Sequence, residues 1–268
     1  MSAARGLARA CHPAPTVAVT ALVTAFAAIL GWRGGGLALV ALAVLAGQLS
    51  VGWANDAKDA ALDRAAARAT KPVVAGLVAP RTLWASALAA LAISCALSWL
   101  AAGWLGGSLH VWAVAWGWLY TLGLSRTPLS WLPYALAFGA LPAFLEIGLG
   151  EPGAPLWLTL AFAVTAVGAH LANALPDVER DRAQGVGGLA VSLGERRAAL
   201  ACWALTGAGT GIVALEALAR WPWLSAVIAV AWLGAVLLTR TRRVSAFHAL
   251  LALVGLDVAA IALAIALG

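Results

Sequence analysis

The residues best suited to chemistry in this sequence are the carboxylates of one short stretch, residues 55–63. Asp56, Asp59 and Asp63 follow Asn55 within nine residues, although the whole chain has only 11 Asp and Glu residues. At 100° per residue, these four side chains fall within about a 100° arc of one helix. Like charges repel and burial disfavours ionised groups, so such a face needs cations. A divalent cation that bridges the carboxylates to a phosphate group would supply them.

A second acidic motif, residues 173–181, lies far along the chain. Asn173, Asp177 and Asp181 follow i, i+4, i+8 spacing, which places them on one helical face with about 40° between steps. Pro176 directly precedes Asp177, so we expect the helix to end or kink there. Two such faces, each after an apolar run, suggest one site built from two halves. The alternative is a pair of solvated helix ends, but ionisable residues near membrane spans usually have a function.

These motifs resemble those of a known family. The first fits N-D-x-x-D-x-x-x-D and is followed by a basic-Pro-x-x-x-Gly element, residues 71–76. The second reads N-A-x-x-D-x-x-x-D, with Ala174 where the family often has Asp, and is followed by Gly-Leu-Ala-Val-Ser-Leu-Gly, residues 188–194. Together they are similar to the UbiA superfamily of intramembrane prenyltransferases, and the resemblance covers most of the chain. It implies a nine-helix membrane fold that ionises isoprenyl diphosphates with Mg²⁺.

The composition independently indicates an all-α, polytopic membrane protein. Apolar residues make up 63% of the chain and charged residues 10%, against roughly 25% charged residues in soluble domains. We expect residues 1–268 to form a single integral-membrane domain, in which a coarse repeat gives two four-helix halves and a ninth helix. The nine expected spans are residues 14–31, 36–54, 81–101, 109–125, 130–149, 156–175, 197–217, 222–239 and 244–267.

The basic residues predict the orientation of these spans. With the N-terminus in the cytoplasm, 15 of the 17 Lys and Arg residues lie on the cytoplasmic side, Arg242 among them, and only Arg33 and Arg220 lie opposite. Both acidic motifs are then cytoplasmic, in a protein of the cell membrane. The net charge of +6 reports this topology and attraction to the lipid bilayer. No basic stripe with interleaved aromatic residues indicates nucleic acid as a partner.

The resemblance implies that an isoprenyl diphosphate loses its diphosphate at the acidic motifs. Mg²⁺ held by the carboxylates would stabilise the leaving group as a Lewis acid. The expected catalytic and metal-binding residues are Asp56, Asp59, Asp63, Asp177 and Asp181, and Asn55 and Asn173 offer neutral oxygen ligands or water contacts. Lys71 and Arg126 are the preferred phosphate-binding cations. The alternative for each is that it contributes only to the excess of positive charge on the cytoplasmic side.

The prenyl cation needs a dry pocket with electron-rich walls. Trp116 and Tyr120 lie one helical turn apart on an expected span and could stabilise it. His170 is on about the same face as Asn173 and could also line the cavity. The alternatives are membrane-interface anchoring for the aromatic residues and an interhelical hydrogen bond for His170. Asp257 lies in the middle of the last span with no partner evident from the sequence.

The sequence is compatible with three functions. The first is prenyl transfer to a lipophilic acceptor, which we take to be aromatic although no residue identifies it. The second is cyclisation of the prenyl diphosphate without an acceptor, as in some terpene cyclases of the superfamily. The third is a cation-binding transporter, but transporter sites usually lie near the bilayer midplane, whereas both acidic motifs follow the ends of spans.

Overall fold

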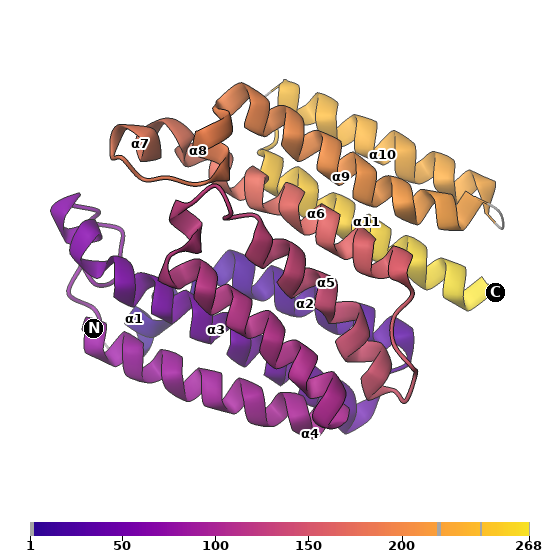
Figure 1. The fold of residues 1–268 in the computed structure, drawn as a ribbon, viewed down its shortest axis with the longest axis horizontal. Helices are drawn as coiled ribbons and strands as arrows, with labels where there is room; N and C mark the ends of the chain where they lie inside the picture. Colours follow the sequence, from indigo (N-terminus) through magenta and orange to yellow (C-terminus); the bar gives the residue numbers. More distant parts are fainter. Residues whose placement is uncertain (1–2, 219–220, 242, 268) are drawn as a thin grey trace.

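The chain is entirely helical in the computed structural model, which describes residues 3–218, 221–241 and 243–267 and shows no strand among them. Arg220 and Arg242, which were used to predict the orientation, lie outside the described residues. Figure 1 shows the helices running roughly along a common direction, with the N-terminal segment and the short α7 and α8 at the same end of the bundle.

Most of the expected spans coincide with helices to within two or three residues. The helices are α1 (Ala3–Ala10), α2 (Pro13–Leu30), α3 (Gly34–Ala65), α4 (Pro80–Leu122), α5 (Leu132–Gly148), α6 (Leu156–Ala174), α7 (Val178–Ala183), α8 (Leu189–Leu193), α9 (Glu195–Leu218), α10 (Pro222–Arg240) and α11 (Ala246–Leu267). Two short 3₁₀ helices, η1 (Leu124–Arg126) and η2 (Leu175–Asp177), follow α4 and α6. The short amphipathic helix α1 was not expected.

Helix α3 continues well past the end of its expected span. Its last two turns contain no Gly or Pro and are rich in Ala, so nothing in the sequence interrupts the helix before Ala65. A helix of 32 residues is about 48 Å long, whereas a hydrocarbon core is about 30 Å thick. The C-terminal end of α3 therefore projects beyond the membrane interior, and it carries the whole first acidic motif.

The expected spans 81–101 and 109–125 form a helical hairpin within α4. Ala102 and Gly103 have non-helical dihedral angles, and the φ of +66° at Gly103 is one that residues with a side chain rarely adopt. The two segments then pack against each other: Ser98 Oγ lies 2.7 Å from His110 Nδ1. A Cβ atom at Gly107 would lie 2.6 Å from the carbonyl oxygen of Ser98, so this crossing requires glycine.

The helices form a closed ring. In chain order α2 packs on α3, α3 on α4, α4 on α5, α5 on α6, α6 on α9, α9 on α10 and α10 on α11, and α11 returns to α2. Large apolar side chains cover the outside, among them Trp104, Leu100 and Val230, which are 76%, 70% and 68% exposed. A soluble domain would not expose such a surface, because it would bind other apolar surfaces.

Six helices in the described part of the chain are long and apolar enough to cross a bilayer: α2, α3, α4, α9, α10 and the helical stretch Leu156–Ala183. Helix α5 and the segment Ala246–Ala262 of α11 are apolar but shorter. The protein is therefore an integral membrane protein. The number of nine crossings and the cytoplasmic N-terminus stay predictions.

The hairpin in α4 leads to a stability prediction. We expect Gly107→Ala to lower the free energy of unfolding by about 1–3 kcal/mol, because the added methyl group overpacks the crossing with Ser98. The matched control is Gly211→Ala on α9, where a Cβ atom meets nothing within 4 Å. Unfolding of both variants in detergent would be compared with the unsubstituted protein. Equal unfolding midpoints for Gly107→Ala and Gly211→Ala would contradict the proposed crossing.

Candidate active site

The end of α3 places two carboxylates of the first motif on its buried side. Asp56 and Asp63 are seven residues apart, two helical turns, and each is 2% exposed. The Asp56 carboxylate accepts a hydrogen bond from Lys71 Nζ at 2.7 Å and lies 3.1 Å from His12 Nε2. Asp63 accepts one from Arg68 Nη1 at 2.9 Å. Each buried carboxylate therefore has a basic partner, as buried charge requires.

His12 reaches Asp56 because the chain before α2 passes close to α3. A Cβ atom at Gly52 would lie 2.8 Å from the carbonyl oxygen of Cys11, so glycine permits this approach. Burial raises the pKa of the Cys11 thiol, and the nearby charge of Asp56 raises it further, which keeps the thiol neutral. The side chain of Asn55 also lies 3.5 Å from His12 Nε2.

Asp59 faces a different segment from Asp56 and Asp63. It accepts a hydrogen bond from Arg126 Nη2 of η1 at 3.0 Å, and both side chains are partly exposed. One residue away, Lys58 Nζ donates to the carbonyl oxygen of Thr121 near the end of α4 at 2.5 Å. These two contacts fix the end of α3 against the end of the α4 hairpin.

The second motif is divided between three elements, as Pro176 predicted. Helix α6 ends at Ala174, η2 contains Pro176 and Asp177, and α7 begins at Val178. Asn173, Asp177 and Asp181 are therefore not on one continuous helical face, which corrects the expectation from their spacing. Arg180 now lies between the two carboxylates: its Nη2 is 2.7 Å from Asp177 Oδ1, and its Nε is 3.9 Å from Asp181 Oδ1.

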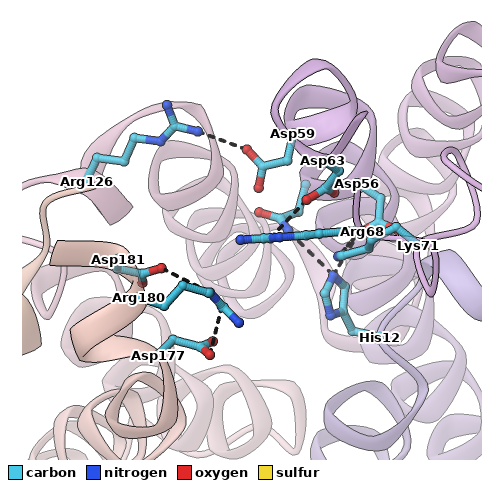
Figure 2. Close-up of polar contacts among 11 residues, drawn as sticks. His12, Asp56, Asp59, Asp63, Arg68, Lys71, Arg126, Asp177, Arg180 and Asp181 are labelled. Atoms are coloured by element: carbon cyan, nitrogen blue, oxygen red, sulfur yellow. Dashed lines mark hydrogen bonds and ion pairs between the residues drawn. The ribbon is translucent and has the colours of Figure 1, made fainter. Parts of the chain in front are cut away.

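The two acidic clusters face each other across a gap. In Figure 2, Asp56, Asp59 and Asp63 approach it from one side, and Asp177, Arg180 and Asp181 approach it from the other. Burial and the neighbouring charge of Asp177 raise the pKa of Asp181, and the positive charges of Arg180 and Arg68 oppose this rise. The loop before α8 follows the second motif and packs closely on η1, because a Cβ atom at Gly187 would clash with the carbonyl oxygen of Arg126.

A cavity of about 460 Å³ opens between the helices beneath this gap. Its polar mouth includes His12, Asn55, Tyr120 and Asn173. Its walls are mainly apolar and come from α2, α3, α4, α5, α6, α9 and α11, with aromatic rings from Tyr134, Phe138, Phe162 and Phe247. A pocket with this gradient suits an amphiphile that has a charged head group and a hydrocarbon tail.

The structure brings most of the predicted site residues to the mouth of the cavity. The residues that gather there are Asn55, Asp56, Asp59, Asp63, Lys71, Tyr120, Arg126, Asn173, Asp177 and Asp181. Trp116 is not among the cavity-lining residues and packs edge-to-face on Trp112. Gly117 and Tyr120 provide the inner face of this helix instead.

His170 also lies outside the cavity lining and makes interhelical contacts. Its Nε2 is 2.9 Å from Ser130 Oγ, and the Ser130 oxygen accepts a hydrogen bond from the backbone N–H of Leu189 at 2.9 Å. The His170 ring packs against both Tyr120 and Tyr134. His170 thus connects α5, α6 and the start of α8 behind the two tyrosines at the cavity.

Four residues that lie at the site were not among its expected catalytic, metal-binding or substrate-binding residues: His12, Arg68, Tyr134 and Arg180. Arg68 follows the first motif by five residues and Arg180 lies within the second, so the density of basic residues was an available signal. The sequence offered no signal for Tyr134 or for the pairing of His12 with Asp56, because both residues reach the site only when α5 and the segment before α2 pack beside α3 and α4.

The donor set of this site fits Mg²⁺. Among the described residues, no three His, Cys, Asp or Glu side chains converge closely enough to hold a metal ion by themselves. Protein-bound Mg²⁺ usually has only one or two carboxylate ligands and completes its shell with substrate phosphate oxygens and water. Two clusters of carboxylates on opposite sides of a polar gap match this pattern.

Comparisons with known proteins agree on one family. A model of the UbiA prenyltransferase family matches residues 16–253. A UbiA homologue from Archaeoglobus fulgidus, solved with GPP and Mg²⁺ bound, has a TM-score of 0.75 and 19% identity, over 97% of this chain and 99% of that one. An apo UbiA homologue from Aeropyrum pernix K1 has a TM-score of 0.70 and 22% identity, over 92% and 97%. A digeranylgeranylglyceryl phosphate synthase has a TM-score of 0.68 and 14% identity, over 100% and 99%. No curated protein matches the sequence.

The contacts of Ser130 lead to a second prediction. Ser130→Ala leaves the Leu189 amide and His170 Nε2 without their partner, so we expect unfolding to become easier by about 1–3 kcal/mol. Hydrogen exchange at the Leu189 amide should become at least tenfold faster. Ser192→Ala is the matched control, because the Ser192 hydroxyl bonds only within its own turn, to the carbonyl of Gly188. Unchanged exchange at Leu189 would show that Ser130 does not connect these elements.

Proposed function

The chain belongs to the UbiA prenyltransferase family, and from this premise we propose that it is a Mg²⁺-dependent enzyme that transfers a prenyl group from an isoprenyl diphosphate to a lipophilic acceptor. One observation carries the proposal: two carboxylate clusters face each other at the polar mouth of a cavity with apolar walls. The homologue solved with GPP and Mg²⁺ has the same fold, which supports a prenyl diphosphate as the donor here.

The residues at the mouth have the charges that a diphosphate requires. Asp56, Asp59 and Asp63 on one side, and Asp177 and Asp181 on the other, would hold Mg²⁺. The bound ions would act as Lewis acids that stabilise the negative charge of the leaving diphosphate. Lys71, Arg68, Arg126 and Arg180 are within reach of the same carboxylates and would bind phosphate oxygens once these carboxylates turn to the metal. The amides of Asn55 and Asn173 lie beside them.

The cavity below would hold the hydrocarbon tail and protect the cation from water. Tyr120 and Tyr134 line it next to the acidic mouth, where positive charge develops as the carbon–oxygen bond breaks. His170 packs behind both rings and would keep them in place. An apolar wall excludes water, which would otherwise capture the cation and release a prenyl alcohol. Trp116 is not placed to take part in this wall.

We further propose that the mouth faces the cytoplasm, in a cell membrane. The described N-terminal helix α1, with Arg5 and Arg9, lies at the same end of the bundle as α7 and α8. This end also carries the basic residues of both motifs, as positive-inside topology requires. Residues 1–268 would act as one integral-membrane unit.

The acceptor distinguishes the two enzymatic interpretations. Transfer to an acceptor and cyclisation without one share the ionisation step and the same carboxylates, so the site residues support both. We favour transfer because the family is one of prenyltransferases. The transporter interpretation has less support, because the motif carboxylates lie at helix ends and each is already paired with a basic side chain.

The role of the carboxylates is tested by removing their charge. We expect Asp59→Asn and Asp177→Asn each to lower diphosphate release at least a hundredfold, because each removes a metal ligand from one side of the gap. The control is Glu216→Gln, which should keep normal turnover. Glu216 is exposed and lies near the C-terminal end of α9, the end away from α8. Near-normal turnover of both Asp variants, in folded protein, would contradict the proposed metal site.

The acceptor is tested by product analysis. Purified protein would be incubated with Mg²⁺ and prenyl diphosphates, first alone and then with aromatic and phosphorylated acceptors, and the extracts examined by mass spectrometry. We expect a prenylated adduct that forms only when an acceptor is present. A cyclic hydrocarbon or terpene alcohol formed without acceptor would establish the cyclase alternative instead.

A further inference from the structure

A carboxyl group lies at the inner end of the cavity, where the proposed reaction has no use for charge. Asp257 of α11 lines the cavity and is only 7% exposed. Thr210 of α9 donates a hydrogen bond to its Oδ2 at 3.0 Å. Its Oδ1 has no hydrogen-bond partner among the described residues. Oδ1 is also buried, so only the small exposed part of this side chain has access to water, and that access is through the cavity.

The depth of Asp257 follows from its position along α11. Phe247 lines the same cavity near the beginning of this helix, at the end of the bundle that carries α7 and α8 (Figure 1). Ten residues later, at 1.5 Å per residue, Asp257 is about 15 Å further in. On α3 and α6 the lining extends from Asn55 to Val44 and from Asn173 to Ala161, about 16–18 Å. On α11 itself the lining continues past Asp257 to Ile261, one helical turn further in, so Asp257 lies in the innermost part of the cavity, which we call its floor.

This depth can be compared with the length of a prenyl tail. Each isoprene unit adds four bonds to the chain, or about 5 Å when extended, since each carbon–carbon bond of about 1.5 Å advances the zigzag by somewhat less. With its diphosphate at the mouth, a tail of about three units reaches the floor. A fourth unit would have to lie against Asp257 and cover it with hydrocarbon.

We propose that Asp257 sets the upper limit of prenyl chain length, at about three isoprene units. The inference rests on the proposed function, because it assumes that the diphosphate is held at the acidic mouth. A tail that covers the carboxyl removes its remaining water and offers no hydrogen bond in return. The limit therefore comes from the polarity of the floor rather than from its size.

Two substitutions separate polarity from size. Asp257→Leu makes the floor apolar and also bulkier, so it should admit longer tails if polarity sets the limit and shorter tails if size does. Asp257→Asn keeps both the size and a polar group, and it is the matched control. In the Leu variant, the Thr210 hydroxyl can bond to a carbonyl of its own helix, as Thr206 does with Cys202.

Binding would be measured with unreactive thiolodiphosphate analogues carrying geranyl, farnesyl and geranylgeranyl chains, in Mg²⁺ and detergent. We expect the unsubstituted protein and Asp257→Asn to prefer farnesyl over geranylgeranyl by at least tenfold. We expect Asp257→Leu to raise relative geranylgeranyl affinity about tenfold, equivalent to 1.4 kcal/mol. Preserved unfolding midpoints would show that the variants are folded.

Two results would overturn the inference. One is a farnesyl-to-geranylgeranyl ratio in Asp257→Leu within twofold of the unsubstituted protein, and the other is a shift towards shorter chains. Diphosphate release from the corresponding reactive substrates is measured separately. Selective binding without release would contradict the proposed ionisation and leave the role of Asp257 standing. Release with unaltered chain selectivity in Asp257→Leu would support the proposed ionisation and overturn the role of Asp257.

Discussion

Two carboxylates of the first acidic motif, Asp56 and Asp59, form contacts that join segments far apart in the chain. Lys71 and His12 reach Asp56, and Arg126 reaches Asp59 from the other side of the α4 hairpin. These contacts are forced by electrostatics, since carboxylates at the edge of a low-dielectric interior are stable only beside positive charge. The same pairing decides where the ends of α2, α3 and α4 and the loop carrying Lys71 can lie, and so it shapes the mouth of the cavity.

Much of this arrangement could be predicted from the sequence because it depends on local rules. Residues 55–63 have no helix breaker, so their helical phase followed from 100° per residue, and Pro176 predicted the break in the second motif. The apolar runs gave most helix boundaries closely. Lys71 and Arg126 were identified as basic residues near the motifs, and the structure pairs them with Asp56 and Asp59.

What could not be predicted depends on packing between distant segments. The tight α4 hairpin requires the contact of Gly107 with Ser98, and no pattern of hydropathy reports it. The inward position of Gly117, rather than Trp116, depends on a rotation of α4 that its nearly uniform apolar surface leaves open. The partner of Asp257 is Thr210, 47 residues away on another helix. Such contacts appear only when the ring of helices is closed.

The gradient from a charged mouth to an apolar interior has a consequence for the two products of the proposed reaction. Breaking one bond of an amphiphile inside this cavity separates an anion that prefers water from a hydrocarbon that prefers oil. The anion is already at the aqueous end, and the hydrocarbon is already among helices surrounded by lipid. The diphosphate would therefore leave into water and the hydrocarbon product into lipid, and neither product would have to pass through the part of the cavity that suits the other.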